Sequence, residues 1–318
     1  MNKNLLFSMM IALTLTACTQ SLADTTPLAP TTTITPTLSF DTPVPQVNTP
    51  VVGAGTALPP LPTFTPIGGQ PTPPPSDTYA VINVPEDEVL NIRSGPGVEN
   101  PVVGVLQPTE SGLMRTGKTS GLGDDLWVEI QNPNGGTGWV KSDFLTEYVA
   151  TSAFCGDARV TSLLQNLETA VNATDGKQLK SLVSPAHGLD VVYIHNGMVA
   201  NYSPEEADWA FQSTYEVNWG LGAGSGEPVI GTFPEVILPA LQDVFKNLTS
   251  TCNEVKLGGA SYVVEWPIEY ANINFYSLNN PGVDPSYAGM DWRTWLAGIE
   301  YVDGQPYLFA LLHYQWEP

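Results

Sequence analysis

Basic residues are scarce in this chain of 318 residues. It has 11 Lys and Arg against 32 Asp and Glu, which gives a formal net charge of -21 at pH 7. Both parts that we expect to fold are acidic: residues 79–150 have ten acids and four bases, and residues 151–318 have nineteen and six. A protein that neutralises phosphates needs Lys and Arg at the contact. The charge therefore argues against nucleic acid and anionic lipid headgroups as partners, and it suits a protein that stays soluble outside the cell.

Long apolar runs are also missing. Leu5–Leu15, which follows the positive charge of Lys3, is shorter than the roughly 20 residues of a membrane-spanning helix, and no second apolar span follows. The run ends in Leu15-Thr16-Ala17-Cys18, which resembles the lipobox of bacterial lipoprotein signal peptides, where the Cys is acylated and becomes the new N-terminus. This predicts a signal peptide over residues 1–18, lipidation of Cys18, and a lipid-anchored location on the extracytoplasmic face of the cell membrane. An ordinary secretory signal with a chance Cys is the alternative.

Residues 19–78 have almost nothing from which to build a core. Fifteen Thr and fourteen Pro dominate this stretch, Phe40 and Phe64 are its only aromatic residues, and it has no Lys or Arg. Such a segment buries too little apolar surface to offset the entropy of ordering it. We therefore predict a disordered, extended linker that lifts the folded part away from the membrane.

Residues 79–150 have the pattern of short strands without a helix. Leu90-Asn91-Ile92-Arg93 alternates apolar and polar residues and breaks at Gly95-Pro96-Gly97, which is a turn signal. Leu126–Ile130 alternates again before a second turn signal at residues 132–136. About five short strands within some seventy residues favour a small closed barrel.

Four segments resemble the bacterial SH3-like domain family in order and spacing. They are LNIRSGPG at 90–97, VVGVL at 102–106, WVEI at 127–130 and GWVKSDFL at 138–145. The resemblance implies a five- or six-stranded barrel that binds cell-wall components such as peptidoglycan peptides, or that acts as a spacer beside envelope proteins. The residues that match the core positions of the family are Leu90, Ile92, Val128, Ile130 and Val140.

Three side chains of the predicted barrel are candidates for ligand contact. Trp127 and Trp139 either belong to the barrel core or form the wall of a groove, since SH3-type barrels take extended peptides in aromatic-lined grooves. Arg93 either forms a structural salt bridge or pairs with a ligand carboxylate through its bidentate fork.

Residues 151–318 mix helical and strand patterns. Apolar spacing, an N-cap at Ser203 and the hairpin signal Asn196-Gly197 mark several elements. Helices are expected over Arg159–Val171, Gly176–Val183, Ser203–Phe211 and Pro234–Leu248. Strands are expected over Tyr262–Trp266, Ile273–Tyr276, Trp292–Val302 and Tyr307–Trp316. The fold class is thus multidomain: the barrel precedes an α+β domain with a curved antiparallel sheet, similar in element order to cystatin-like and nuclear-transport-factor-two-like folds.

A second set of segments resembles an uncharacterised domain of bacterial lipoproteins. It comprises Trp219–Pro228 with its glycine-rich stretch, Gly289–Arg293, and His313 with Trp316. The resemblance implies one continuous domain and no particular activity. Its tryptophans either line a ligand pocket or pack in the core. The positions that it nominates for ligand binding are Trp219, Glu227, Asp291, Trp292, Arg293 and His313.

Two cysteines remain if Cys18 is lipidated. Cys155 and Cys252 lie in the same domain of an exported chain, which favours a disulfide between them. The alternative is a cysteine nucleophile, which needs a His within hydrogen-bond reach. The histidines of the chain are His187, His195 and His313. No peptidase motif surrounds Cys155.

Other site chemistries find little support in the sequence. The three histidines lack metal-ligand spacing such as HExxH, and Gly220–Gly226 lacks the Lys of a phosphate-binding loop. Carboxylates for glycoside hydrolysis are present, but the sequence gives none of the distances that this reaction needs. These carboxylates are Glu227, Glu265, Glu269, Asp291 and Glu300. Asp291 is better explained as an ion-pair partner of Arg293 at the start of a strand. We predict no metal and no cofactor.

The sequence thus predicts a lipid-anchored cell-envelope protein that recognises or scaffolds the cell wall without catalysis. Its expected partners are the membrane, through the lipid, and either peptidoglycan or an envelope protein. One alternative is a cell-wall glycan or peptide hydrolase with its catalytic groups in residues 151–318. Another is an accessory lipoprotein of an envelope transport or secretion complex.

Overall fold

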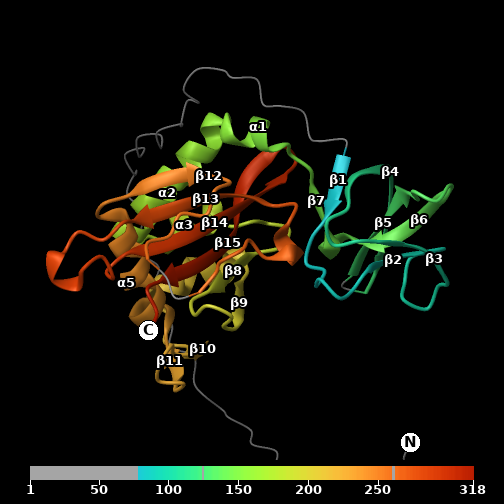
Figure 1. The fold of residues 1–318 in the computed structure, drawn as a ribbon. Helices are drawn as coiled ribbons and strands as arrows, with labels where there is room; N and C mark the ends of the chain where they lie inside the picture. The colour runs from blue at the N-terminus through green and yellow to red at the C-terminus, as the bar shows by residue number, and fades with distance from the viewer. Residues whose placement is uncertain (1–77, 124, 260–261) are drawn as a thin grey trace, which may run out of the picture. The chain divides into compact units, whose positions relative to one another are not determined.

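The structure, a computed structural model, describes residues 78–123, 125–259 and 262–318 (Figure 1). The predicted signal peptide, Cys18 and nearly all of the predicted linker lie outside these residues. Within them the chain forms a seven-stranded sheet, a six-stranded sheet and a two-stranded hairpin. All of the described residues belong to one compact unit.

The seven-stranded sheet is the predicted barrel. Its strands are β1 (Thr78–Val81), β2 (Leu90–Arg93), β3 (Val102–Leu106), β4 (Ser111–Leu122), β5 (Asp125–Gln131), β6 (Thr137–Lys141) and β7 (Leu145–Glu147). Their order is β3-β2-β6-β5-β4-β1-β7. Five or six strands were expected. The additional strand arises because the 3-10 helix η1 (Ser142–Phe144) turns the chain after β6, and β7 then pairs with β1.

Alternate residues of the barrel strands form its core, since successive side chains of a strand point to opposite faces. The five positions that match the family core are all buried in one cluster. The turn after β2 needs glycine at one place: Gly97 has φ 111°, a left-handed conformation that side chains with a Cβ rarely adopt.

Helices begin the C-terminal domain. They are α1 (Thr151–Cys155), α2 (Ala158–Ala173), α3 (Gly176–Leu182), α4 (Pro204–Trp209) and α5 (Phe233–Phe245), with 3-10 turns η2 (Ala210–Gln212), η3 (Ile268–Tyr270) and η4 (Pro285–Tyr287). Capping boxes open α4 and α5: Ser203 and Thr232 accept backbone N–H bonds from Glu206 and Glu235, whose carboxylates bond back. None of the described helices has both the length and the apolar character needed to cross a membrane.

The six-stranded sheet takes two strands from the chain between α3 and α4 and four from the chain after α5, and it ends in its two longest strands. Its members are β8 (Leu189–Val192), β9 (Val199–Tyr202), β12 (Thr249–Cys252), β13 (Asn274–Asn280), β14 (Arg293–Val302) and β15 (Gln305–Gln315), in the order β12-β13-β14-β15-β8-β9. Neighbours are antiparallel except β15 and β8, which run parallel. The separate hairpin of β10 (Val217–Leu221) and β11 (Pro228–Gly231) holds the glycine-rich segment in its loop.

Both faces of the six-stranded sheet are covered. Helices α2 and α5 pack on one face, where Leu167, Leu241 and Trp295 share a buried cluster (Figure 1). The other face carries a second cluster, to which Ile82 and Tyr270 belong. Because Ile82 directly follows β1, one barrel residue belongs to the core of the C-terminal domain.

Two expectations about this domain need comment. Tyr262–Trp266 was predicted to be a strand and is not one; its aromatic side chains pack over the sheet face, and β12 takes the edge beside β13. The predicted helices and the two long strands are present, with ends shifted by a few residues. The likeness to cystatin-like and nuclear-transport-factor-two-like folds stays a prediction.

Buried polar groups also join the barrel to the C-terminal domain. The side-chain amide of Asn272 lies 2.9, 3.3 and 3.1 Å from the carbonyl oxygens of Val81, Pro108 and Glu110. A single residue of the C-terminal domain thus satisfies backbone acceptors at the end of β1 and in the loop between β3 and β4, which fastens one part against the other.

Candidate functional site

Trp127 lies on the outer face of the barrel, although only 3% of its surface is exposed. Its neighbour in β5, Val128, belongs to the barrel core, so Trp127 points the opposite way. Trp127 pairs with Lys141 of β6 and faces the loop between β1 and β2 across a groove of about 190 Å³. Most side chains that line this groove are apolar, among them Val84, Val89, Val98 and Phe144. Of the two roles predicted for Trp127, its position supports the groove wall.

Arg93 also lines the groove, but its guanidinium is occupied. Nη1 donates to the carbonyl oxygens of Val98, at 2.6 Å, and Asn100, at 2.9 Å. Arg93 forms no salt bridge with the residues that the structure describes, so the predicted structural ion pair is wrong. The side chain instead holds the turn that follows β2.

The remaining polar groups of the groove differ in whether they have hydrogen-bond or ion-pair partners. Lys141 Nζ lies 2.8 Å from both Asp125 and Asp143, and these hydrogen bonds raise the pKa of Lys141. The indole nitrogen of Trp127 is buried and has no hydrogen-bond partner in the described part of the chain. Buried donors almost always have a partner, so this N–H is the unsatisfied group beside an otherwise apolar groove.

Trp139 occupies a different part of the outer face. It is half-buried and lies opposite Arg93 of β2 and Glu129 of β5. Glu129 is itself held by Thr116 at 2.7 Å and Lys118 at 2.9 Å. Trp139 does not line the groove at Trp127, so the two tryptophans do not form one aromatic wall.

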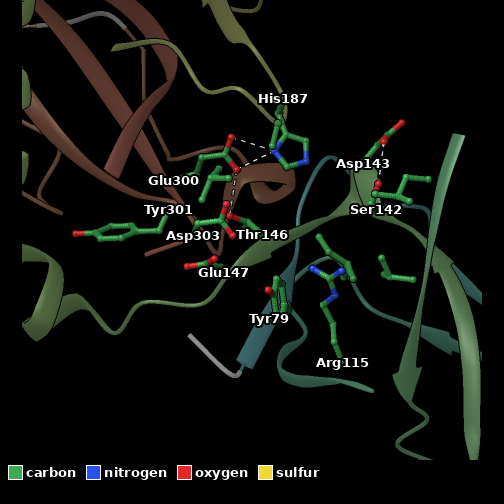
Figure 2. Close-up of a pocket in the computed structure, with 15 residues that line it drawn as sticks. Tyr79, Arg115, Ser142, Asp143, Thr146, Glu147, His187, Glu300, Tyr301 and Asp303 are labelled. Carbon is green, nitrogen blue, oxygen red and sulfur yellow. Dashed lines mark hydrogen bonds and ion pairs between the residues drawn. The ribbon is translucent and has the colours of Figure 1, made fainter. Parts of the chain in front are cut away.

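A second cavity, of about 310 Å³, lies between the open end of the barrel and the turn that joins β14 and β15 (Figure 2). Domain interfaces and barrel mouths are common places for ligand pockets. The charged and aromatic residues that line it are Tyr79, Arg115, Asp143 and Glu147 of the barrel and His187, Glu300, Tyr301 and Asp303 of the C-terminal domain. We call this the interdomain cavity.

A buried ion pair forms one wall of the interdomain cavity. His187 Nδ1 lies 2.8 Å from Glu300 Oε2, and the Glu300 side chain is fully buried. Thr146 of β7 donates to the same carboxylate at 3.2 Å. Burial by itself lowers the pKa of His187, but the hydrogen bond and charge of Glu300, the charge of Asp143 and the carbonyl of Ser142 outweigh it and raise the pKa. Groups of both domains thus favour the charged form of this ring.

Ser184 completes the surroundings of Glu300 but is not placed as a nucleophile. Its hydroxyl donates to the Glu300 carboxylate and accepts from the backbone N–H groups of Ala186, at 3.1 Å, and His187, at 3.2 Å. A serine nucleophile must instead face a histidine that takes its proton. His187 Nδ1 instead contacts the Glu300 carboxylate, and the Ser184 hydroxyl donates to that same carboxylate, so the two side chains are not placed for this transfer. This group is a structural tie and not a hydrolytic triad.

The tryptophans nominated in the C-terminal domain are buried. Trp219 is fully buried, and its indole nitrogen donates to the Gly231 carbonyl at 3.0 Å. Trp292 is 1% exposed and donates to the Gly259 carbonyl at 2.8 Å. Their rings and polar atoms are thus used inside the protein, which favours packing over a pocket wall.

Glu227, Asp291 and Arg293 lie in three separate settings. Glu227 is exposed in the β10–β11 loop. Asp291 Oδ2 accepts the backbone N–H groups of Val283 and Asp284, each at 2.9 Å, and so holds a loop. The ion pair predicted between Asp291 and Arg293 is wrong, because Arg293 Nη1 pairs with Asp243 of α5 at 2.9 Å.

His313 lies inside the sheet and is 1% exposed. Its Nδ1 donates to the Tyr193 carbonyl at 2.9 Å, and its ring stacks on that of Tyr193 with centroids 4.7 Å apart. Burial, together with the charge of Arg293, lowers its pKa to about 3, although the Tyr193 bond acts in the opposite direction. His313 is therefore neutral, with Nε2 buried and unpartnered among the described residues.

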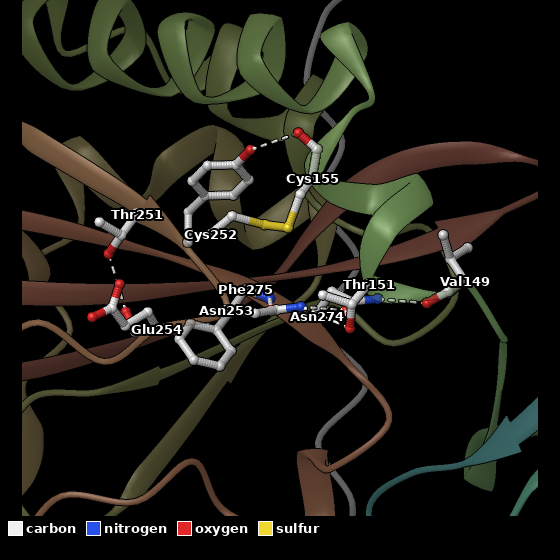
Figure 3. The surroundings of a disulfide bond; sticks show 10 residues. Val149, Thr151, Cys155, Thr251, Cys252, Asn253, Glu254, Asn274 and Phe275 are labelled. Atoms are coloured by element: carbon white, nitrogen blue, oxygen red, sulfur yellow. Dashed lines mark hydrogen bonds between the residues drawn. A yellow bond between two sulfur atoms is a disulfide. The ribbon is translucent and has the colours of Figure 1, made fainter.

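Cys155 and Cys252 form the predicted disulfide, which joins α1 to β12 across 97 residues of sequence (Figure 3). Asn253, the residue after it, bonds to Asn274 of β13 at 2.6 Å, and Asn274 donates to the Val149 carbonyl at 2.7 Å. The bridge and these amides fasten the start of the domain to the edge of its sheet. Neither Cys155 nor Cys252 is a free thiol in this structure, so neither is available here as a nucleophile.

Sequence reasoning nominated few of the residues around the interdomain cavity. Glu300 was considered only as one of several carboxylates for glycoside hydrolysis, and His187 only as one of three histidines. Arg115 was not considered. The stretch from Ser184 to Gly188 has residues typical of a turn, but nothing in it predicted the contact between His187 and Glu300. Among the described residues, no group of three or more His, Cys, Asp or Glu side chains is arranged to hold a metal ion.

Comparison with known proteins adds one finding. Residues 88–146 match the family model of the bacterial SH3 domain, which confirms the resemblance of the barrel segments. Searches of curated proteins and of solved structures gave no significant match.

Proposed function

We propose that this bacterial SH3 domain binds peptide of the cell wall, in a protein held on the extracytoplasmic face of the membrane by a lipid on Cys18. The family match and the barrel support the binding part of the proposal. The lipobox-like residues and the Thr/Pro-rich segment support anchoring at a distance from the membrane. The disulfide between Cys155 and Cys252 fits an oxidising compartment outside the cytoplasm.

The observation that carries the proposal is the setting of Trp127. It is a large aromatic side chain outside the barrel core, beside an apolar groove, with a buried indole N–H that lacks a partner among the described residues. An extended peptide offers backbone carbonyls for such a donor and apolar side chains for the groove walls. Interface energy also concentrates at buried aromatic anchors of this kind.

The C-terminal domain is proposed as a rigid companion of the barrel. Ile82, Asn272 and the hydrogen bond from Thr146 to Glu300 join the two parts. Glu300 is one of the carboxylates considered for glycan hydrolysis, but it is already paired with His187. No observation among the described residues favours a hydrolase, so recognition without catalysis remains the proposal.

Binding to purified cell-wall sacculi tests this function. The mature chain from residue 19, with Cys18 removed, should sediment with sacculi. Val89→Glu places a charge on the groove wall at a position that is 40% exposed, and it should reduce the retained fraction about tenfold because an apolar ligand leaves that charge unpaired. Val105→Glu is the matched control, since Val105 is 44% exposed on β3 and does not line the groove.

The outcomes separate the competing functions. Loss of retention with Val89→Glu alone supports the groove. Equal retention of both variants places the wall-binding surface elsewhere. If the unmodified protein stays in solution, wall binding is refuted and a protein partner of an envelope complex takes its place. Muropeptides released into the supernatant, detected by mass spectrometry, would instead identify a hydrolase.

A further inference from the structure

The interdomain cavity holds two opposite charges that are not paired with each other. Arg115 of β4 forms no ion pair and no side-chain hydrogen bond with the described residues, and its guanidinium lies over the Tyr79 ring, 4.9 Å from the centroid. Asp303, in the turn between β14 and β15, likewise has no such partner within the described ranges. Arg115 comes from the barrel and Asp303 from the C-terminal domain (Figure 2).

The other charged groups of this cavity are already committed. Glu300 is bound to His187 at 2.8 Å, and Asp143 to Lys141 at 2.8 Å. Glu147 accepts the backbone N–H of Gly304 at 3.0 Å. Among the described lining residues, Arg115 and Asp303 are therefore the charges left for a ligand.

Within the described residues, Arg115 and Asp303 form no ion pair with each other, and they come from two parts of the protein that are joined by hydrogen bonds. Thr146 of β7 bonds to Glu300 of β14, and Asn272 bonds to the end of β1 and to the loop after β3. A ligand that carries both a negative and a positive group satisfies both residues at once. It also avoids the repulsion that an anion meets near a domain with nineteen acids and six bases.

We propose that the interdomain cavity binds a small zwitterion, namely a free amino acid or a short peptide with both termini free. Arg115 takes the carboxylate through its bidentate fork, and Asp303 takes the ammonium group. The apolar side chains of Leu126, Val128 and Val302 line the space between them. A volume of about 310 Å³ is at the small end of the range for ligand pockets, which suits a ligand of one or two residues.

Calorimetry on the mature chain with three forms of one dipeptide tests this site. Alanyl-alanine has both charges, its N-acetyl derivative lacks the ammonium, and its C-terminal amide lacks the carboxylate. Alanyl-alanine should bind saturably, and each derivative should bind about tenfold more weakly or worse, because one desolvated charge pair is lost. D-Alanyl-D-alanine, measured beside the L isomer, distinguishes wall-derived peptides from ordinary ones.

Two substitutions should give opposite signatures. Arg115→Gln should bind alanyl-alanine and its amide equally, and Asp303→Asn should bind alanyl-alanine and its N-acetyl form equally. Lys118→Gln is the matched control, because Lys118 is on the same strand as Arg115 but pairs with Glu129 at 2.9 Å away from the cavity. The proposal is overturned if the unmodified protein shows no saturable binding. It is also overturned if the N-acetyl derivative and the C-terminal amide bind as tightly as alanyl-alanine. The Val89→Glu protein should retain dipeptide binding, so this site stands or falls independently of the groove.

Discussion

His187 Nδ1 lies 2.8 Å from Glu300 Oε2, and the pair is completed from the barrel by Thr146 and by the carbonyl of Ser142. The hydrogen bond and charge of Glu300 raise the pKa of this histidine, in a setting that both domains build. Removing one member of a buried ion pair leaves the other charge without compensation, which costs about 3–5 kcal/mol. Loss of the proton from His187 therefore weakens the group through which Thr146 of the barrel contacts the C-terminal domain.

Stability should fall with rising pH on the alkaline side because of His187. Its folded-state pKa is raised above the unfolded value of about 6.5, so its contribution is complete below that pH and is lost as the pH rises through the folded-state pKa. Urea titrations between pH 6 and 9 should show this decline in the unmodified protein and a flatter profile in His187→Gln. His195→Gln is the control, since His195 is 3.9 Å from Glu317 and more exposed. Identical slopes in all three proteins would argue against the tie.

His313 should have the opposite effect on the acidic side. It stays neutral when folded, with a pKa near 3, but takes a proton when unfolded below about pH 6.5. The folded state therefore loses about 1.4 kcal/mol of stability per pH unit as the pH falls from about 6.5 towards 3. His313→Gln, which keeps a donor for the Tyr193 carbonyl, should be less stable at neutral pH but should lose stability less steeply in acid. Parallel profiles for the two proteins would contradict the assignment.

Reduction of the disulfide should destabilise the C-terminal domain strongly. Cys155 and Cys252 are separated by 97 residues, and closing a loop of that size is worth up to about 4.7 kcal/mol in the chain-entropy model. The unmodified protein should therefore melt at a lower temperature in the presence of reductant. The double variant Cys155→Ser, Cys252→Ser should match the reduced protein and show no response to reductant; a further drop on adding reductant would be inconsistent with this bridge.

Neighbouring residues Val81 and Ile82 should reveal whether the two domains unfold together. Val81 packs in the barrel core and Ile82 in the core of the C-terminal domain, and both are fully buried. Ile82→Ala should cost about 2–5 kcal/mol, and Val81→Ala less because it removes a smaller group. Calorimetry should show a single transition that moves to lower temperature in both variants. Two separate transitions, with each substitution moving only one, would show that the barrel unfolds independently.

Local patterns in the sequence determined much of the secondary structure. The spacing of apolar residues predicted α2 and α5 to within a few residues, and Ser203 with Glu206 predicted the capped start of α4. These signals work because helix faces and caps involve residues three or four positions apart. Tyr262–Trp266 misled the same reasoning, since its β-rich composition serves packing against a sheet face and not pairing at an edge.

The candidate sites were less accessible to such reasoning. Trp127 was nominated as either a groove or a core residue, and only its strand register placed it outside the barrel core cluster and beside a groove. Arg93 was nominated for a carboxylate, yet its fork is filled by two turn carbonyls that lie five and seven residues away. Arg115 and Asp303 carry no motif, because their significance comes only from lining one cavity without pairing.

By itself, the sequence determined the barrel family, the disulfide partners and the main helices with the two long final strands, because these follow from local periodicity, turn chemistry and the parity of cysteines. Only the tertiary structure decided that the barrel and the C-terminal domain share a buried interface. At that interface Thr146 of the barrel bonds to Glu300 across 154 residues of sequence, and Glu300 in turn pairs with His187 of its own domain across 113; no pattern within a short window of sequence encodes such separations. Long-range pairing of buried charges is set by how the sheets stack, and that is a property of the whole fold.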